Sequence, residues 1–264
     1  MKFIDSHCHL NFKAFNEDRK KVITSAKKAG IEKIIAPGAD LHSSYNALIL
    51  AQEQENYCFA ALGIHPHHAN KVLNIAEDVV ELEKMIDRKY VKAIGEIGLD
   101  YHIYKGQTAY SRKEIQQELL IEQIKLGDKY HLPLIIHCRE AFDDLFNLLN
   151  DYKTVLEKIG GVIHCFTGGL VHLRQAASLH LMVGFDGNIT YDERLQTVVK
   201  EAPVESILIE TDSPWLTPIP YRGKRNEPKN VRLIAKEIAK IKELDLTKVA
   251  QITTDSAKKL FKLN

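Results

Sequence analysis

Short apolar runs alternate along the chain with longer amphipathic segments. The apolar runs predict eight strands, near residues 2–7, 32–37, 57–62, 91–96, 133–137, 161–165, 181–185 and 206–210. Helical periodicity between and after them is well marked at the end of the chain, where Val231, Ile234, Ala235, Ile238 and Ile241 share one face. Strands that recur every 25 to 35 residues, roughly, are typical of repeated βα units. The pattern therefore predicts a parallel sheet with helical connections.

Eight βα units in 264 residues favour a TIM (β/α)8 barrel, an α/β fold, with a doubly wound open sheet as the alternative. The sequence contains no glycine-rich phosphate motif of the GxGxxG or Walker type, which removes the usual reason to prefer a nucleotide-binding open sheet. No long Gly/Ser/Pro linker divides the chain either. We therefore expect residues 1–264 to form a single domain.

Side chains that commonly bind metals stand at the ends of five predicted strands. In IDSHCHL, His7 and His9 are two residues apart, so on an extended segment they share a face while Cys8 points away. The others close the runs VKAIGE, PLIIH, GGVIH and SILIETD, and they are Glu96, His137, His164 and Asp212. A closed barrel brings the C-terminal ends of its strands around one opening. The six residues therefore predict a metal centre at that end.

Four imidazoles and two carboxylates are more than one tetrahedral ion requires. Two divalent ions that share a bridging carboxylate would use all six, and such a pair suits hydrolysis at phosphorus or at a carbonyl carbon. Imidazole and carboxylate ligands together suit zinc, manganese, iron or nickel, and a histidine-rich set favours zinc or manganese. Each position also has a simpler explanation: a single histidine at a strand end is often a core residue, and Asp212 followed by Ser213 and Pro214 resembles a helix start. Agreement among six positions favours the metal centre.

Further polar residues fall near the same predicted opening. His65, in GIHPHH, could contact substrate or support a ligand. Arg139 could bind a phosphate through its planar guanidinium, or it could pair with Glu140. Glu210 could carry a proton, support a ligand, or be an acid paired inside the barrel.

A long segment after the last strand, PWLTPIPYRGKRNEP, is rich in proline and basic residues. Its Arg222, Lys224 and Arg225 could bind phosphate groups, although short charge runs are usually solvated. Aromatic residues in the loops after strands four and eight could stack on the bases of a single strand or pack within the protein, and they are Tyr101, Tyr104, Trp215 and Tyr221.

Composition narrows the class of protein. The 36 basic and 35 acidic residues give a formal net charge of +1, which argues against a broad surface for duplex nucleic acid but allows local basic patches. The four cysteines are scattered, and we expect reduced thiols. No apolar run approaches the ~20 residues of a membrane helix, and no signal segment opens the chain. We expect a cytoplasmic protein with no membrane contact and no evident protein partner.

Several motifs occur in a fixed order, and they are DSHCHL, GIHPH, GEIGLDY, LPLIIHCREA, HCFTG and ETDSPWLTPIPYRGKRNEP. Together they resemble the TatD family of metal-dependent deoxyribonucleases from the first strand to about Phe261. The resemblance implies a TIM barrel, a divalent-metal centre and cleavage of phosphodiester bonds, commonly by removing nucleotides from the 3′ end of DNA. Similarity to magnesium-dependent nucleases adds magnesium to zinc and manganese as a candidate ion. The expected partner is therefore single-stranded DNA or a frayed 3′ end.

The resemblance also implies roles for individual residues. It places one ion on His7, His9 and Asp212 and a second ion on His137 and His164, with Glu96 bridging them. We expect catalytic roles for Glu96, Asp212 and Glu210, and substrate binding by His65, Arg139, Arg222, Lys224 and Arg225. The chain departs from the family at Trp215, where tyrosine is common, and Cys8 occupies the variable position of the HxH pair.

Two alternatives stay open at this point. Related barrels include amidohydrolases and esterases, among them deacylases acting on aminoacyl-tRNA, although such enzymes often bridge their metals with a modified lysine where this chain has Glu96. The second alternative is a metal-stabilised binding protein without turnover. A closed structural site requires fewer ligands than this chain offers.

Overall fold

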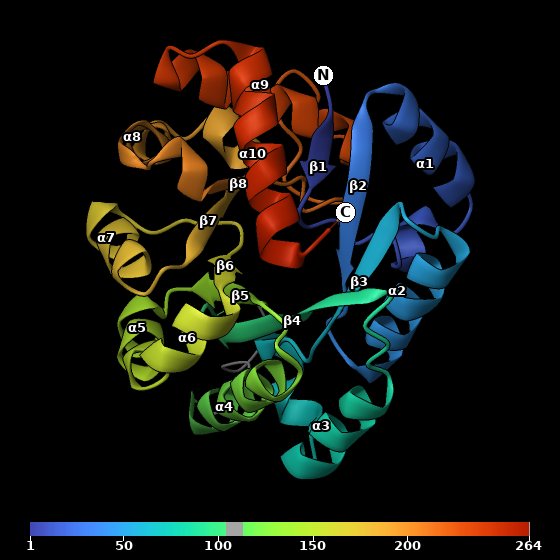
Figure 1. The fold of residues 1–264 in the computed structure, drawn as a ribbon, viewed down its shortest axis with the longest axis vertical. Helices are drawn as coiled ribbons and strands as arrows, with labels where there is room; N and C mark the ends of the chain where they lie inside the picture. Colours follow the sequence, from blue (N-terminus) through green and yellow to red (C-terminus); the bar gives the residue numbers. More distant parts are fainter. Residues whose placement is uncertain (104–112, 264) are drawn as a thin grey trace.

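Eight parallel strands form a ring with helices around it in the computed structural model, which describes residues 1–103 and 113–263 (Figure 1). Neighbouring strands pair in chain order from β1 to β8. The strands are β1 (Phe3–Asp5), β2 (Ile31–Pro37), β3 (Cys58–Leu62), β4 (Val91–Asp100), β5 (Leu134–Arg139), β6 (Gly161–Ile163), β7 (Met182–Phe185) and β8 (Ile207–Ile209). The prediction of a TIM barrel is confirmed. The main difference in bounds is β4, which continues four residues past its predicted end at Glu96.

Helices connect the strands along the outside of the ring. The α-helices are α1 (Arg19–Lys28), α2 (Leu41–Glu53), α3 (Ile75–Lys84), α4 (Lys113–Tyr130), α5 (Phe142–Asp151), α6 (Lys153–Ile159), α7 (Leu170–Ser178), α8 (Glu193–Glu201), α9 (Val231–Lys242) and α10 (Leu246–Phe261). Short 3-10 helices are η1 (Lys13–Phe15), η2 (Pro66–Lys71), η3 (Gly187–Thr190), η4 (Val204–Ser206) and η5 (Pro228–Asn230). In α9, four of the five residues predicted to share an apolar face are buried. None of the helices in the described part of the chain is long and apolar enough to span a membrane.

Closure of the ring depends on segments just beyond β1 and β8. The amide of Ser6 donates to the carbonyl of Ile209 at 3.1 Å, and the amide of Asp212 donates to the carbonyl of His7 at 2.9 Å. Cys8 and Ser213 form a further parallel bridge. These contacts hold the two segments side by side, so residues about two hundred positions apart in the sequence meet at one end of the barrel.

The barrel interior is filled by side chains that alternate with outward-facing ones along each strand. Its buried apolar cluster contains Ile4, Ile35, Phe59, Ala61, Ala93, Ile135, Val162 and Leu208. The same cluster includes Ala257 and Phe261 of α10, which crosses the N-terminal ends of the strands (Figure 1). This end of the barrel is therefore closed by apolar packing.

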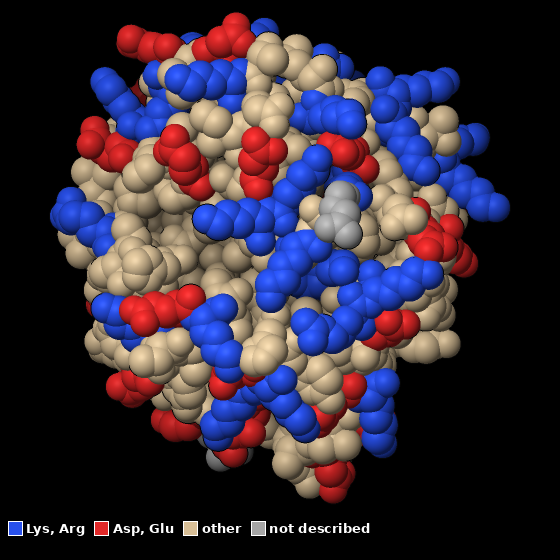
Figure 2. Space-filling model, viewed as in Figure 1, with Lys and Arg blue, Asp and Glu red and all other residues tan. Residues whose placement is uncertain are grey.

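Lysine and arginine side chains gather on the face that α10 covers, around the C-terminal end of the chain (Figure 2). The ammonium groups of Lys33 and Lys92 lie 5.3 and 5.6 Å from the ring centre of Phe59. Burial lowers the pKa of Lys33, and the nearby Lys258 acts in the same direction. Although the net charge of the chain is near zero, this face therefore carries a local basic patch. It lies at the end of the barrel opposite the candidate metal ligands.

Candidate metal centre

All six predicted ligands converge at the C-terminal end of the barrel. His7 and His9 follow β1 in an extended segment, and their Nε2 atoms lie 3.1 Å apart. Between them, Cys8 is fully buried and its amide donates to the carbonyl of Ile35. The prediction that the two histidines share a face is confirmed, although β1 itself ends at Asp5.

A first group of donor atoms combines His7, His9, Asp212 and one oxygen of Glu96. From Oε2 of Glu96, Nε2 of His7 is 3.4 Å away and Nε2 of His9 is 3.5 Å away. Oδ1 of Asp212 lies 3.7 Å from the first imidazole and 3.4 Å from the second. Four donors that each lie about 2.1 Å from a tetrahedral ion are about 3.4 Å from one another. The group therefore fits one ion.

A second group forms around the other oxygen of Glu96. Oε1 lies 3.0 Å from Nδ1 of His137 and 2.8 Å from Nε2 of His164, and these two nitrogens are 3.3 Å apart. Burial alone would raise the pKa of Glu96, but the surrounding imidazoles, His164 foremost, outweigh burial and hold the pKa well below its usual value. An anionic carboxylate with one oxygen in each donor group has the arrangement of a bridging ligand.

His65 also reaches this carboxylate, with Nε2 3.1 Å from Oε1 of Glu96. Its other nitrogen, Nδ1, accepts the backbone amide of His67 at 3.0 Å. Burial lowers the pKa of His65 to about 3, so the ring is neutral. A neutral imidazole that accepts at Nδ1 carries its proton on Nε2 and donates there. This tautomer makes His65 a donor that orients Glu96 and disfavours its use as a metal ligand.

Asp100 is a further residue of the candidate site, and the sequence did not lead us to predict it. Its Oδ2 lies 3.0 Å from Nε2 of His137 and 2.6 Å from Nε2 of His67, and its side chain is completely buried. A carboxylate on the outer nitrogen of a ligating histidine fixes the tautomer and the ring orientation. The sequence holds a signal for it, because Glu96 and Asp100 are four residues apart on one extended strand and so share a face.

Changing Asp100 to asparagine should reduce metal affinity and activity about 10- to 100-fold, the usual effect of losing such an outer partner. The amide keeps the shape of the side chain but has no charge, so its oxygen accepts the Nε2 proton of His137 more weakly and stabilises less the tautomer that leaves Nδ1 free. Metal titration of the variant, with circular dichroism as a folding control, checks this. Unchanged metal affinity would show that His137 is held by packing alone.

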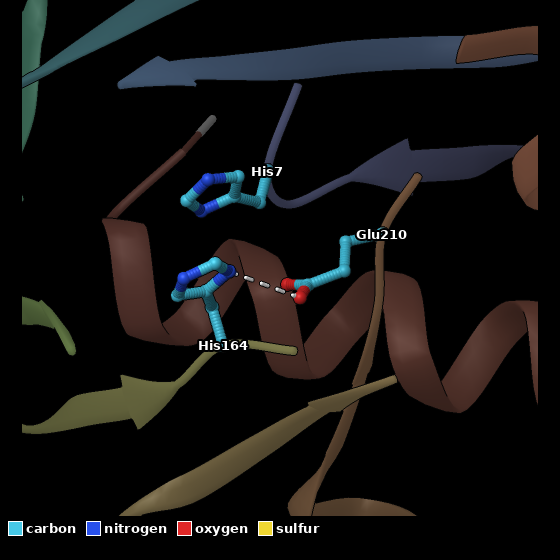
Figure 3. Close-up of side chains that lie close together, drawn as sticks. All are labelled: His7, His164 and Glu210. Atoms are coloured by element: carbon cyan, nitrogen blue, oxygen red, sulfur yellow. Dashed lines mark ion pairs between the residues drawn. The ribbon is translucent and has the colours of Figure 1, made fainter. Parts of the chain in front are cut away.

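Glu210 lies behind His164 and faces Nδ1, the ring nitrogen opposite the one near Glu96 (Figure 3). The His7 and His164 rings stack at 3.9 Å between centroids (Figure 3). Glu210 is fully buried, its Oε1 accepts the amide of Cys165 at 2.5 Å, and its Oε2 accepts the hydroxyl of Ser6 at 3.2 Å. This position suits the orientation of His164 better than direct proton transfer to a substrate.

A cavity of about 660 Å³ opens above the two donor groups. It is lined by His9, Phe12, Ala39, His65, His67, His68, Glu96, His137, Cys138, Arg139, His164, Cys165, Thr167, Asn188, Asp212, Trp215 and Leu216. Arg139 is therefore at the cavity, as predicted, whereas Arg222, Lys224 and Arg225 are not among the residues that line it. Glu140, which the sequence offered as a possible partner of Arg139, has its carboxylate 2.6 Å from Nδ1 of His102.

Arg222 and Arg225 of the basic loop after β8 make contacts with residues outside the cavity. The guanidinium of Arg225 makes two bonds to Asp18, of 3.0 and 2.7 Å, and donates to the carbonyl of Ala14. The guanidinium of Arg222 lies 4.0 Å from the ring centre of Tyr191. Arg225 thus attaches the loop to the segment before α1. We expected this residue to bind phosphate, but its contacts here are structural. Among the predicted aromatic residues, Tyr104 lies outside the described residues.

Comparison with known proteins agrees with this architecture. Residues 4–262 match the family model described as TatD related DNase. The chain is 38% identical to the uncharacterized metal-dependent hydrolase YabD of Bacillus subtilis (98% of this chain, 99% of the relative). It is 32% identical to the 3′-5′ ssDNA/RNA exonuclease TatD of Pectobacterium atrosepticum (98% and 99%). The crystal structure of YjjV, a TatD homolog from Escherichia coli, superposes with a TM-score of 0.89 at 31% identity (99% and 98%).

The match extends over almost the entire chain, and the buried histidines and carboxylates form two donor groups that fit divalent ions. The chain therefore belongs to the TatD family of metal-dependent hydrolases.

Proposed function

We propose that this protein is a 3′-5′ exodeoxyribonuclease that hydrolyses phosphodiester bonds of single-stranded DNA or frayed ends with two divalent ions. The observation that carries the proposal is the placement of Glu96, whose two oxygens each belong to a different donor group. His7, His9 and Asp212 would hold one ion, and His137 and His164 would hold the other. A pair of ions held in this way would lower the pKa of a bound water and would neutralise charge on a phosphodiester.

The protein's own residues supply position and shape around that pair. His65 and Asp100 hold Glu96 and His137 in fixed orientations, and Glu210 faces His164 from the other side. Arg139 lines the cavity, where its guanidinium can bind a phosphate that flanks the bond to be cleaved. The imidazole-rich donor set favours zinc or manganese, and magnesium remains the third choice to test.

The depth of the ligands favours a single strand as the substrate. His7, His9, Glu96 and His164 are almost completely buried below the cavity, so a phosphodiester reaches them only where the backbone is free to bend inward. A paired duplex is wide and stiff, with a persistence length of about 150 base pairs. The relative from Pectobacterium, named as an exonuclease of single-stranded DNA and RNA, supports the same substrate class and the 3′ polarity.

With a 5′-labelled single-stranded oligonucleotide, the protein loaded with magnesium, manganese or zinc should produce a ladder that shortens from the 3′ end. A 3′-labelled copy should release its label as a mononucleotide from the start of the reaction. Blunt duplex, single-stranded RNA and an aminoacyl-tRNA serve as parallel substrates. Internal fragments would contradict an exonuclease, and release of the amino acid without strand shortening would favour the deacylase.

A further inference from the structure

The two sides of the cavity differ in chemistry. Phe12, Trp215 and Leu216 line the side next to the first donor group, where the Phe12 and Trp215 rings lie 4.4 and 5.2 Å from the His9 ring between centroids. His67, His68 and Arg139 line the cavity as well, and the His67 ring is 6.2 Å from His137 of the second group. One side is therefore aromatic and the other polar and basic.

Trp215 is the most exposed part of the aromatic side. The residue keeps 48% of its surface accessible, although the His9 and Phe12 rings contact its indole. Its ring meets His9 at an interplanar angle of 73° and Phe12 at 85°. Its backbone is fixed, because the amide of Trp215 donates to the carbonyl of Asp212 at 3.0 Å. A large aromatic ring thus lies beside the candidate ligands, lines the cavity and keeps about half of its surface accessible.

Trp215 differs in position from the other exposed large side chains of its loop. Ile219 and Tyr221, in the same loop, are 51% and 44% exposed, but they do not line the cavity. Trp215 does, and it is adjacent to the donor atoms at which a phosphodiester would bind. A planar ring that stacks on Trp215 would remove its apolar surface from water, and every nucleobase offers such a ring.

We propose that Trp215 is the stacking surface for a nucleobase of the substrate, with Phe12 packed against the indole at nearly a right angle. This rests on the proposed nuclease function and adds an orientation to it. The stacked base lies on the side of His9 and Asp212, and the phosphate flanking the cleaved bond lies toward Arg139 on the side of His137. Binding then depends on the base as well as on the phosphate, without requiring a particular base, because stacking tolerates all four.

Trp215 is the only tryptophan of the chain, so intrinsic fluorescence reports on it directly. Titration of the metal-loaded protein with dTMP should quench this fluorescence in a saturable way. Deoxyribose 5-phosphate, which has the same phosphate and sugar but lacks the base, should cause much less quenching at concentrations that compete equally for the site. Equal quenching by the two compounds, or none by dTMP, would overturn the proposal whether or not the protein cleaves DNA.

A kinetic test uses oligonucleotides with a normal or an abasic 3′-terminal nucleotide. Wild-type protein should show a KM at least about fivefold lower for the normal strand, and Trp215→Ala should bring the two KM values together. The loss should fall mainly on KM, as expected for a binding contact, and Trp215→Phe should restore most of it. Tyr221→Ala is the matched control and should keep the wild-type difference.

The two hypotheses fail in different ways. If the wild type leaves every DNA strand intact, the nuclease function is wrong, and the dTMP titration still decides whether Trp215 contacts a base. If the wild type degrades normal and abasic strands with the same KM, the nuclease function stands and the stacking role is wrong. An equal rise of KM for both strands in Trp215→Ala would also refute stacking, because it would show a general change of the cavity.

Discussion

Replacing Glu96 with glutamine should abolish hydrolysis while the barrel stays folded. The carboxylate is the one group shared by both sets of donor atoms, with imidazole nitrogens 2.8 to 3.5 Å from its oxygens. Glutamine has nearly the same shape but no charge, and its nitrogen is a poor ligand for a divalent ion. Metal-ion catalysis lowers the barrier by several kcal/mol, and each ~1.4 kcal/mol is tenfold in rate, so we expect a loss of at least about 1,000-fold.

The measurement pairs exonuclease activity with metal content and thermal unfolding of the same preparation. Glu140→Gln is a suitable control, because that carboxylate pairs with His102 on the surface and is not among the residues that line the cavity. It should behave as the wild type does. Full activity in Glu96→Gln with two ions bound would show that Glu96 is not the bridge, whereas a loss of activity caused by unfolding would appear in circular dichroism.

The six candidate metal ligands could be proposed from the sequence because their signal is local. Each ligand lies within a few residues of the end of an apolar run, and the two-residue spacing of His7 and His9 fixes a common face in any extended segment. The closed barrel then brings the strand ends together whatever their separation in sequence. Six positions could therefore be proposed as one site without knowledge of any distance.

The residues around the ligands were harder to predict because their roles depend on contacts that residue type and spacing alone do not reveal. His65 acts as a donor since the amide of His67 occupies its Nδ1, which is a property of the local backbone path. Arg225 pairs with Asp18, which is 207 positions earlier in the chain, so charge patterning within the loop gave no indication of it. Asp100 was missed because β4 continues beyond the predicted strand end.

Mutations that remove a ligand from only one of the two donor groups should have the second large effect on metal content and hydrolysis. Oδ1 of Asp212 lies near His7 and His9 in the first group, whereas Nδ1 of His137 belongs to the second group. Asp212→Ala and His137→Ala should each reduce bound metal from two ions to one per chain and reduce hydrolysis at least about 1,000-fold, because neither remaining ion alone supplies the stabilisation of the pair. Metal analysis after gel filtration measures the stoichiometry. Two ions retained in either variant, or both lost in each, would contradict two separable sites bridged by Glu96.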